Sequence, residues 1–398
     1  MRGLKLVGLG AAVWGRATIA TALLVIGQTL PTKPGDPLPG ITPIEFTEFR
    51  LGLDDFTEVE TVEDGLGPAF NGTSCAVCHN VPAIGGTSLI LETRAAHQDE
   101  SRHFRALNSA GDTLIHLFSV PTHACQPAMP DEANVVAHRI PIPIFGAGLV
   151  EAIPDEMILG LQDPFDRNGD GVRGRAAIVV DVASGERRVG RFGWKAQQAT
   201  LMAFGADAYL NEMGITNDLF PREYAYGISD EQVRRCDRKP EPEDERNPST
   251  GRRGIDNFEA FMRFLAPVSR APVDDAVRDG ERIFDAIGCA TCHVPALMTG
   301  PSANPLFNRR AVPLFSDLLL HDIGTGDGIP QAAAKPEEIR TPALWGLRFR
   351  RPLLHDGSAA TIEDAIERHQ READLARRGF VQLSPDDRVH LFAFLRSL

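Results

Sequence analysis

Two copies of one pentapeptide carry the residues best suited to chemistry in this chain. They are residues 75–79 (CAVCH) and residues 289–293 (CATCH). Cys-x-x-Cys-His is the attachment signature of c-type haem, in which two thiols bond to the porphyrin and the imidazole becomes an iron ligand. A thioredoxin-like pair or half of a zinc site needs no His at that position and does not explain the repetition. The motifs therefore predict two covalently attached haems, held by Cys75, Cys78, His79, Cys289, Cys292 and His293.

The second axial ligand of each iron decides what each haem can do. Two strong protein ligands suit electron transfer, whereas an open position can bind peroxide. After the second motif, His369 lies in residues 361–376, which are predicted to form a helix that could present it to the iron. The alternative is a solvated histidine on that helix. His321 and His355 each precede Asp, which indicates turns whose imidazoles could face the haem edge or its propionates.

Peroxide cleavage also requires a group that moves a proton between the two oxygens. Glu92 and Glu151 are candidates by position, although each is more often an ordinary surface carboxylate. Trp194 could relay electrons between haems or simply pack at an interface. The sequence alone selects no catalytic residue.

Residues 166–171 (DRNGDG) match the first half of a calcium loop, with candidate oxygen ligands on Asp166, Asn168 and Asp170. Ala177 stands where the bidentate Glu of loop position twelve is expected. Both a Ca²⁺ ion completed by another segment and an Asx-rich turn without metal remain open.

The net charge limits the classes of partner, and the cysteines outside the haem motifs bear on the redox compartment. The formal net charge of −13 disfavours nucleic acid and anionic membrane surfaces, and favours a small basic redox protein as electron donor or acceptor. Cys125 and Cys236 are left over from the haem motifs. They could form a disulfide in an oxidising compartment or remain two unrelated buried thiols.

The N-terminus indicates export. The apolar run at residues 17–27 follows Arg16 and has the length of a signal-peptide core, too short to span a bilayer. We expect residues 1–30 to be a signal peptide or, if uncleaved, an N-terminal anchor and the only membrane contact. Because c-type haem attachment is completed outside the cytoplasm, we expect a periplasmic location.

The elements that must position the haems can be outlined from composition and periodicity. Residues 31–45 and the charged, Pro-rich residues 237–253 read as linkers. They delimit an N-terminal c-type haem domain at residues 46–236 and a C-terminal cytochrome c domain at residues 254–398. In the latter, a helix is predicted before the second motif, and Ser384-Pro385 predicts the start of a closing helix.

A loose internal repeat supports two related domains. Residues 139–146 (RIPIPIFG) echo residues 340–346 (RTPALWG), and each copy follows its own haem motif. The first domain carries a large insertion, of which residues 176–182 and 187–192 read as a hairpin. We therefore predict a mainly α fold with two cytochrome c-like haem domains, the first enlarged by an insertion with a small β-hairpin.

Several stretches resemble the bacterial di-haem oxidoreductase family, whose members are described as peroxidases and sometimes as thiol oxidoreductases. These stretches are residues 71–86 (NGTSCAVCHNVPAIGG), 145–154 (FGAGLVEAIP), 189–196 (VGRFGWKA) and 317–324 (DLLLHDIG). Residues 340–366 are also similar to the C-terminal haem domain of the related di-haem cytochrome c peroxidases. The resemblance runs from about residue 45 to the end of the chain.

The resemblance implies specific ligands. In the peroxidases, a Met at a fixed spacing after His-Asp-Gly binds the electron-transferring haem, and His369 stands at that position here. This implies that His293 and His369 are the two axial ligands of the C-terminal haem. A distal His on the first haem would make His97 or His103 conceivable, but an open iron is equally so. The Trp-Asp-Gly-Arg segment of the peroxidases is absent here.

The same resemblance implies an enzyme. We expect a periplasmic di-haem c-type oxidoreductase, peroxidase-like and acting on hydrogen peroxide, with electrons passing from the C-terminal bis-His haem to a reactive N-terminal haem. The alternative is a di-haem electron-transfer cytochrome with no substrate of its own. Thiol oxidation has only the family description behind it, since Cys125 and Cys236 form no Cys-x-x-Cys pair.

Overall fold

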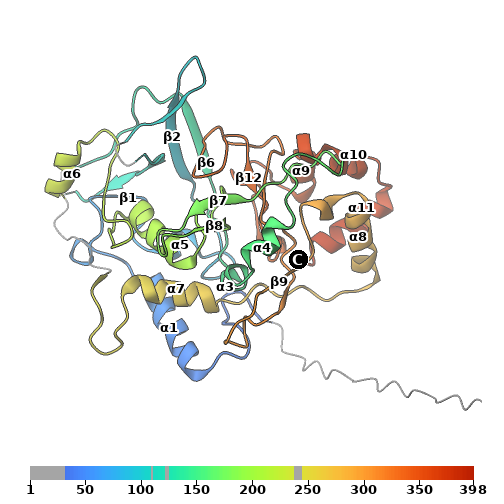
Figure 1. The fold of residues 1–398 in the computed structure, drawn as a ribbon, viewed down its shortest axis with the longest axis horizontal. Helices are drawn as coiled ribbons and strands as arrows, with labels where there is room; N and C mark the ends of the chain where they lie inside the picture. Colours follow the sequence, from blue (N-terminus) through green and yellow to red (C-terminus); the bar gives the residue numbers. More distant parts are fainter. Residues whose placement is uncertain (1–31, 109–110, 122–124, 237–243) are drawn as a thin grey trace, which may run out of the picture. The chain divides into compact units, whose positions relative to one another are not determined.

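The computed structural model describes residues 32–108, 111–121, 125–236 and 244–398 (Figure 1). The expected signal peptide or anchor at residues 1–30 lies outside these residues, as do residues 237–243 of the expected linker. In the described part of the chain, no helix is long and apolar enough to cross a membrane.

Short helices make up most of the regular structure, as the sequence predicts. The α-helices are α1 (Pro43–Thr57), α2 (Cys75–Cys78), α3 (Ala147–Glu151), α4 (Asp155–Leu159), α5 (Leu201–Ala208), α6 (Asp230–Cys236), α7 (Gly254–Phe264), α8 (Asp275–Ala286), α9 (Ile362–Glu367), α10 (Asp374–Val381) and α11 (Pro385–Leu395). A π-helix, η2 (Tyr209–Met213), continues α5. The 3₁₀ turns are η1 (Val62–Asp64), η4 (Cys289–Thr291), η5 (Leu347–Phe349) and η6 (Arg371–Ala373).

The strands are short and antiparallel. They are β1 (Ala69–Phe70), β2 (Glu92–Gln98), β3 (Phe104–Ala106), β4 (Leu114–Ile115), β5 (Phe118–Ser119), β6 (Val135–Arg139), β7 (Ala177–Val180), β8 (Arg187–Gly190), β9 (Leu297–Met298), β10 (Ala311–Val312), β11 (Leu320–His321) and β12 (Ile339–Arg340). Strand β2 pairs with β3, β4 and β6, and the others pair as β1–β5, β7–β8, β9–β10 and β11–β12.

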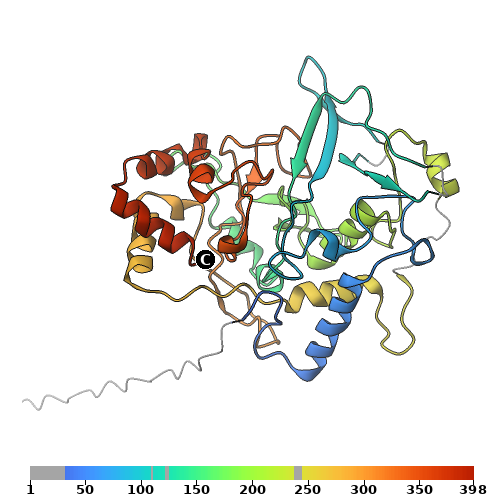
Figure 2. The ribbon, with the colours of Figure 1, turned by 180° about the vertical axis from the view of Figure 1, so that it is seen from behind.

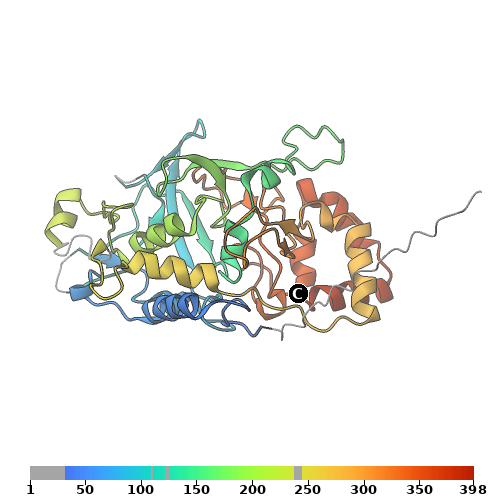
Figure 3. The ribbon, with the colours of Figure 1, turned by 60° about the horizontal axis from the view of Figure 1, so that its bottom comes forward.

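Two helices cross closely beside the first haem motif. Gly52 of α1 faces the backbone of Asn257 in α7, so closely that a Cβ at Gly52 would collide with it. Phe56 then packs against Phe261 with ring centroids 4.8 Å apart. Figure 3 shows α1 and α7 running side by side. The missing side chain at Gly52 is what allows this approach.

The second motif has the same crossing. Gly280 of α8 faces the backbone of His390 in α11, and Phe284 packs against Phe394 with centroids 5.1 Å apart. In both crossings the Gly and the Phe are one helical turn apart on the first helix. The predicted start of the closing helix is confirmed, since Ser384 Oγ accepts a hydrogen bond from Asp387 N. Figure 2 shows α8 and α11 from behind.

The crossing partner of α1 comes from an unexpected part of the sequence. Helix α7 falls within residues 254–398, which the sequence assigns to the C-terminal domain. Its buried residues Phe258 and Phe261 nevertheless join the core that contains Phe49 and Phe56 of α1. The helix that closes the first haem region therefore lies after the charged linker.

The β-structure is more extensive than the sequence predicts. The expected hairpin is present as β7 and β8. The sheet around β2 was not predicted, because β2 (ETRAAHQ) has a polar composition and no clean alternation. Its central residues are buried, and the buried Arg94 satisfies its charge with Glu92 and Asp112. Ion pairs thus stabilise the buried part of β2, which lacks the apolar alternation by which a strand is recognised in a sequence.

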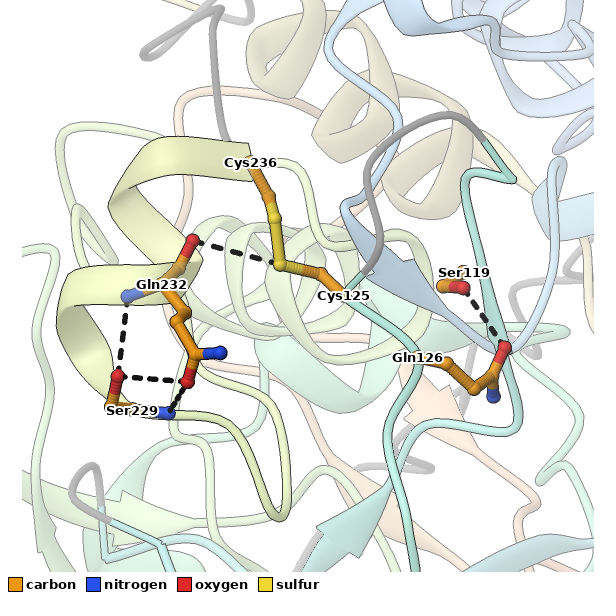
Figure 4. Close-up of a disulfide and its surroundings, with 6 residues drawn as sticks. All are labelled: Ser119, Cys125, Gln126, Ser229, Gln232 and Cys236. Carbon is orange, nitrogen blue, oxygen red and sulfur yellow. Dashed lines mark hydrogen bonds between the residues drawn. A yellow bond between two sulfur atoms is a disulfide. The ribbon is translucent and has the colours of Figure 1, made fainter.

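The two remaining cysteines are joined. Cys125 and Cys236 form a disulfide with Cα atoms 6.5 Å apart, which links the end of α6 to the segment after β5 (Figure 4). Cys125 Sγ also lies 3.6 Å from the carbonyl oxygen of Gln232. The alternative of two unrelated thiols is therefore wrong.

Candidate haem sites

The first haem motif forms a short helix whose histidine is fixed through one ring nitrogen. Ser74 caps α2 by accepting a hydrogen bond from Ala76 N. His79 Nδ1 lies 2.8 Å from the carbonyl oxygen of Gly86, and its ring packs edge-on against Phe56. Burial lowers the pKa of His79, so the imidazole stays neutral. A neutral ring that donates Nδ1–H to a carbonyl leaves Nε2 free for iron.

The second motif repeats this arrangement. His293 Nδ1 lies 3.0 Å from the carbonyl oxygen of Phe315, and its ring packs against Phe284. Burial lowers the pKa of His293 to about 4. Phe56 and Phe284 are the phenylalanines of the two helix crossings, so each proximal histidine is positioned by its own crossing. This arrangement suits the binding of one haem at each motif.

The helix expected around His369 does not form as one piece. Residues 361–376 divide into α9, the turn η6 and the start of α10. The helix stops because Gln370 N donates to Ile323 O and Arg371 takes a positive φ of 51°. His369 Nδ1 lies 2.7 Å from Ala365 O, so its Nε2 is also free.

One cavity brings the second haem motif and His369 together. It is lined by Cys289, Cys292, His293 and His369, and its walls are mostly apolar. The empty space, counted out to the open mouth, is about 1530 Å³. The charge of His369 contributes to lowering the pKa of His293, after burial, which places the two rings near each other. Two thiols and two neutral imidazoles in an apolar cavity fit a haem.

The candidate calcium loop is held by hydrogen bonds within itself. Asp166 Oδ1 accepts from Gly171 N, and Asp170 Oδ1 accepts from Val172 N. Asn168 donates to Asp170 Oδ2 at 2.9 Å. These bonds are those of an Asx-rich turn, and the calcium site stays a prediction.

A different cluster lies beside the second motif. Among the described residues, the donor atoms of Cys292, Asp317 and His321 lie within 4.8 Å of one another. His321 is held between Asp317 and Glu372, with N···O distances of 2.9 Å to each. Burial opposes the charged ring, but the charges and hydrogen bonds of Asp317 and Cys292 together outweigh burial and raise the pKa of His321 well above its usual value. The cluster forms a hydrogen-bond network beside Cys292 of the second motif.

Sequence reasoning missed two half-buried acids, Asp207 and Glu212. The π-helix η2 presents Glu212, whose carbonyl oxygen accepts hydrogen bonds from Asn71 N and Gly72 N, just before Cys75. Burial, with the charges of Glu212 and Glu92, raises the pKa of Cys78 to about 12. π-Helical turns occur frequently at functional sites.

These acids are protonated more readily than ordinary carboxyls. Burial, reinforced by the charge of Glu92, raises the pKa of Glu212 to about 8. Burial, reinforced by Asp112, raises the pKa of Asp207 to about 7. A signal was present in the sequence: Asp207 and Glu212 are the only acids in the apolar residues 201–215.

The two candidate acids named from the sequence have structural partners. Glu92 accepts from Arg94 Nε at 2.6 Å. Glu151 accepts from Leu201 N at the start of α5 and lies 3.1 Å from Arg263. Glu92 lies near the first motif, whereas Glu151 holds the start of a helix.

The histidines considered for the first haem have other partners. His97 Nδ1 lies 2.8 Å from Glu132 O, and the exposed His103 pairs with Asp99. His116 is buried, with Nε2 3.0 Å from Asn211 O next to Glu212. Each of these three histidines therefore already has one ring nitrogen engaged elsewhere.

Trp194 is buried between the two repeated segments. Its Nε1 donates to Ile140 O at 2.8 Å, and its ring packs edge-on against His355 at 6.2 Å. Both residues line the haem cavity. The position suits packing between the repeats and also places an aromatic ring at the cavity wall.

Comparisons with known proteins agree with the resemblance seen in the sequence. The family described as "Di-haem oxidoreductase, putative peroxidase" matches residues 119–398. No curated protein matches the chain.

Similarities to solved structures are weak. Hydrazine synthase of Kuenenia stuttgartiensis is 16% identical, with 98% of this chain and 100% of that chain covered and a TM-score of 0.42. The diheme peroxidase BthA of Burkholderia thailandensis is 16% identical, with 92% and 89% covered and a TM-score of 0.39. A MauG-like protein associated with microbial copper homeostasis is 16% identical, with 71% and 95% covered and a TM-score of 0.34. These similarities carry no function over.

Proposed function

Because this chain belongs to the di-haem oxidoreductase family, we propose that it is a periplasmic, peroxidase-like enzyme with two c-type haems. The two Cys-x-x-Cys-His motifs support covalent attachment. The shared hydrogen bonding of His79 and His293 through Nδ1 supports iron ligation through Nε2 at both sites.

We propose different roles for the two sites. His293 and His369 line one cavity with Nε2 free on each ring, which supports a bis-His haem that transfers electrons to the first haem. The first haem, when bound at His79, supplies the iron at which peroxide reacts.

The observation that carries the peroxidase proposal is the half-buried Glu212. A group that moves protons works best when its pKa is close to the working pH, and that of Glu212 is raised to about 8. We infer that this carboxyl takes up and returns the proton that moves between the peroxide oxygens. Glu92 and Arg94 form an ion pair, and their charges shift the pKa of Glu212 in opposite directions, Glu92 upward and Arg94 downward.

Spectroscopy of the holoprotein with two attached haems tests this division of roles. We expect one low-spin haem, and one haem whose electronic and EPR spectra change on addition of cyanide or peroxide. Two low-spin haems that neither reagent alters would favour the electron-transfer cytochrome instead. Glu212→Gln should lower peroxide turnover at least tenfold, whereas Glu231→Gln, an exposed change on α6, should not.

The compartment and the partner follow from the same proposal. Export is supported by the N-terminal apolar run and by the Cys125–Cys236 disulfide, which persists in oxidising compartments. The net charge of −13 supports a small basic redox protein as electron donor. Salt-dependent reduction by such a protein would test the partner.

A further inference from the structure

Buried arginines in this chain fall into two groups. The described arginines that are largely hidden from solvent are Arg94, Arg139, Arg191, Arg340 and Arg350. The first three each have a carboxylate partner, namely Glu92, Asp327 and Asp155. Among the described residues, Arg340 and Arg350 have no carboxylate within 4.0 Å. A buried charge without a counter-ion is strongly unfavourable.

The contacts of the two unpaired arginines are all with neutral carbonyls. Arg340 donates from Nε to Gly193 O at 2.9 Å and from Nη1 to Thr341 O at 3.0 Å. Arg350 donates from Nη1 to Ala343 O at 3.2 Å, and its Nε has no partner. Burial lowers the pKa of both to about 10, and the charge of Arg350 lowers that of Arg340 further. The only acid that offsets Arg340, Asp317, already binds His321.

Both guanidinium groups line the cavity that holds the second haem motif. His355 lines the same cavity, is 3% exposed, and has no partner for Nε2. Two cations without a counter-ion and one ring nitrogen without a hydrogen-bond partner therefore line one space. An anion with two acidic groups, bound in that space, would satisfy all of them.

The internal repeat offers a comparison within the chain. Arg139 is the counterpart of Arg340 in residues 139–146, and it bonds to Asp327 and Gln331. Arg139 does not line the haem cavity, whereas Arg340 does. The copy that faces the cavity is thus the one without a protein anion.

We propose that Arg340 and Arg350, assisted by His355, bind the propionate carboxylates of the C-terminal haem. This inference rests on the proposed function in one respect: it requires haem in this cavity. The two guanidinium groups would offset the propionate charge and raise the reduction potential of the haem above that of an unpaired site. Arg340 N also donates to Trp194 O, so the anion site is joined to the Trp194 segment.

The test compares variants of the holoprotein by spectroelectrochemical titration and resonance Raman spectroscopy. In Arg350→Gln and Arg340→Gln we expect the midpoint potential of the low-spin haem to fall and its propionate bending mode to shift. Arg350→Lys keeps the charge, so it should restore most of the potential while the propionate mode stays shifted. Arg378→Gln is the control, since Arg378 is 69% exposed and pairs with Asp374 outside the cavity. It should change neither quantity.

Two results separate this inference from the function on which it rests. Suppose that the wild type binds both haems and that one of them is low-spin. If Arg350→Gln then leaves the potential and the propionate mode of the low-spin haem unchanged, the arginine assignment is overturned while the proposed function stands. If the wild type shows no low-spin haem, the bis-His assignment fails first. Should the glutamine variants not mature, Arg350→Lys decides, because an unshifted propionate mode in it overturns the arginine assignment.

Discussion

Replacing Glu212 by Gln measures how much this carboxyl lowers the free energy of unfolding. Burial, with the charge of Glu92, raises the pKa of Glu212 from its ordinary 4.5 to about 8. The folded protein therefore holds this proton more tightly than the unfolded chain does. Its stabilising effect is fully present below about pH 4.5 and is lost as the pH rises through about 8.

The size of the effect follows from the two pKa values. At about 1.4 kcal/mol per unit, Glu212 lowers the free energy of unfolding by almost nothing at pH 4, by about 3 kcal/mol at pH 7 and by about 5 kcal/mol at pH 9. Gln has nearly the same shape and does not ionise. Glu212→Gln should therefore be more stable than the wild type by a margin that grows with pH.

Denaturant unfolding of the haem-loaded protein at several pH values checks this expectation. Glu231→Gln serves as the control, because Glu231 is exposed on α6 and its pair with Arg235 contributes little. Its difference from the wild type should stay within about 0.5 kcal/mol at every pH. A Glu212→Gln difference that stays constant between about pH 5 and about pH 9 would refute the idea that this carboxyl is held protonated.

Three further substitutions test other parts of the structure. His369→Ala should convert the C-terminal haem from low to high spin in EPR spectra; an unchanged signal would remove His369 as ligand. Gly280→Ala should destabilise the protein by about 1–3 kcal/mol or more in thermal unfolding, because the added Cβ would collide with the backbone of His390. Cys125→Ser should lower the free energy of unfolding by about 2–5 kcal/mol, since the lost disulfide closes a long loop. If the bond is responsible, the wild type and the variant should have the same free energy of unfolding once both are reduced.

The features that the sequence predicted correctly depend on nearby residues. The hairpin β7–β8 and the start of α11 at Ser384 follow from alternation and capping within a few positions. The haem motifs are local patterns as well: the spacing of Cys75, Cys78 and His79 indicates covalent haem attachment, which stays a prediction. The predicted helix over residues 361–376 fails because its interruption depends on Ile323, which is distant in sequence.

The tertiary structure decided everything that depends on burial and on contacts between distant segments. Helix α7 packs against α1, and the carbonyl oxygen of Glu212 binds the backbone just before the first motif. Arg340 and Arg350 line one cavity, and among the described residues no carboxylate lies within 4.0 Å of either guanidinium. A sequence states which side chains carry charge, but their pKa values and partners depend on how much water and which neighbours the fold leaves around them. Residue types and spacing thus identify the two haem motifs, and the environment created by folding distinguishes the two sites.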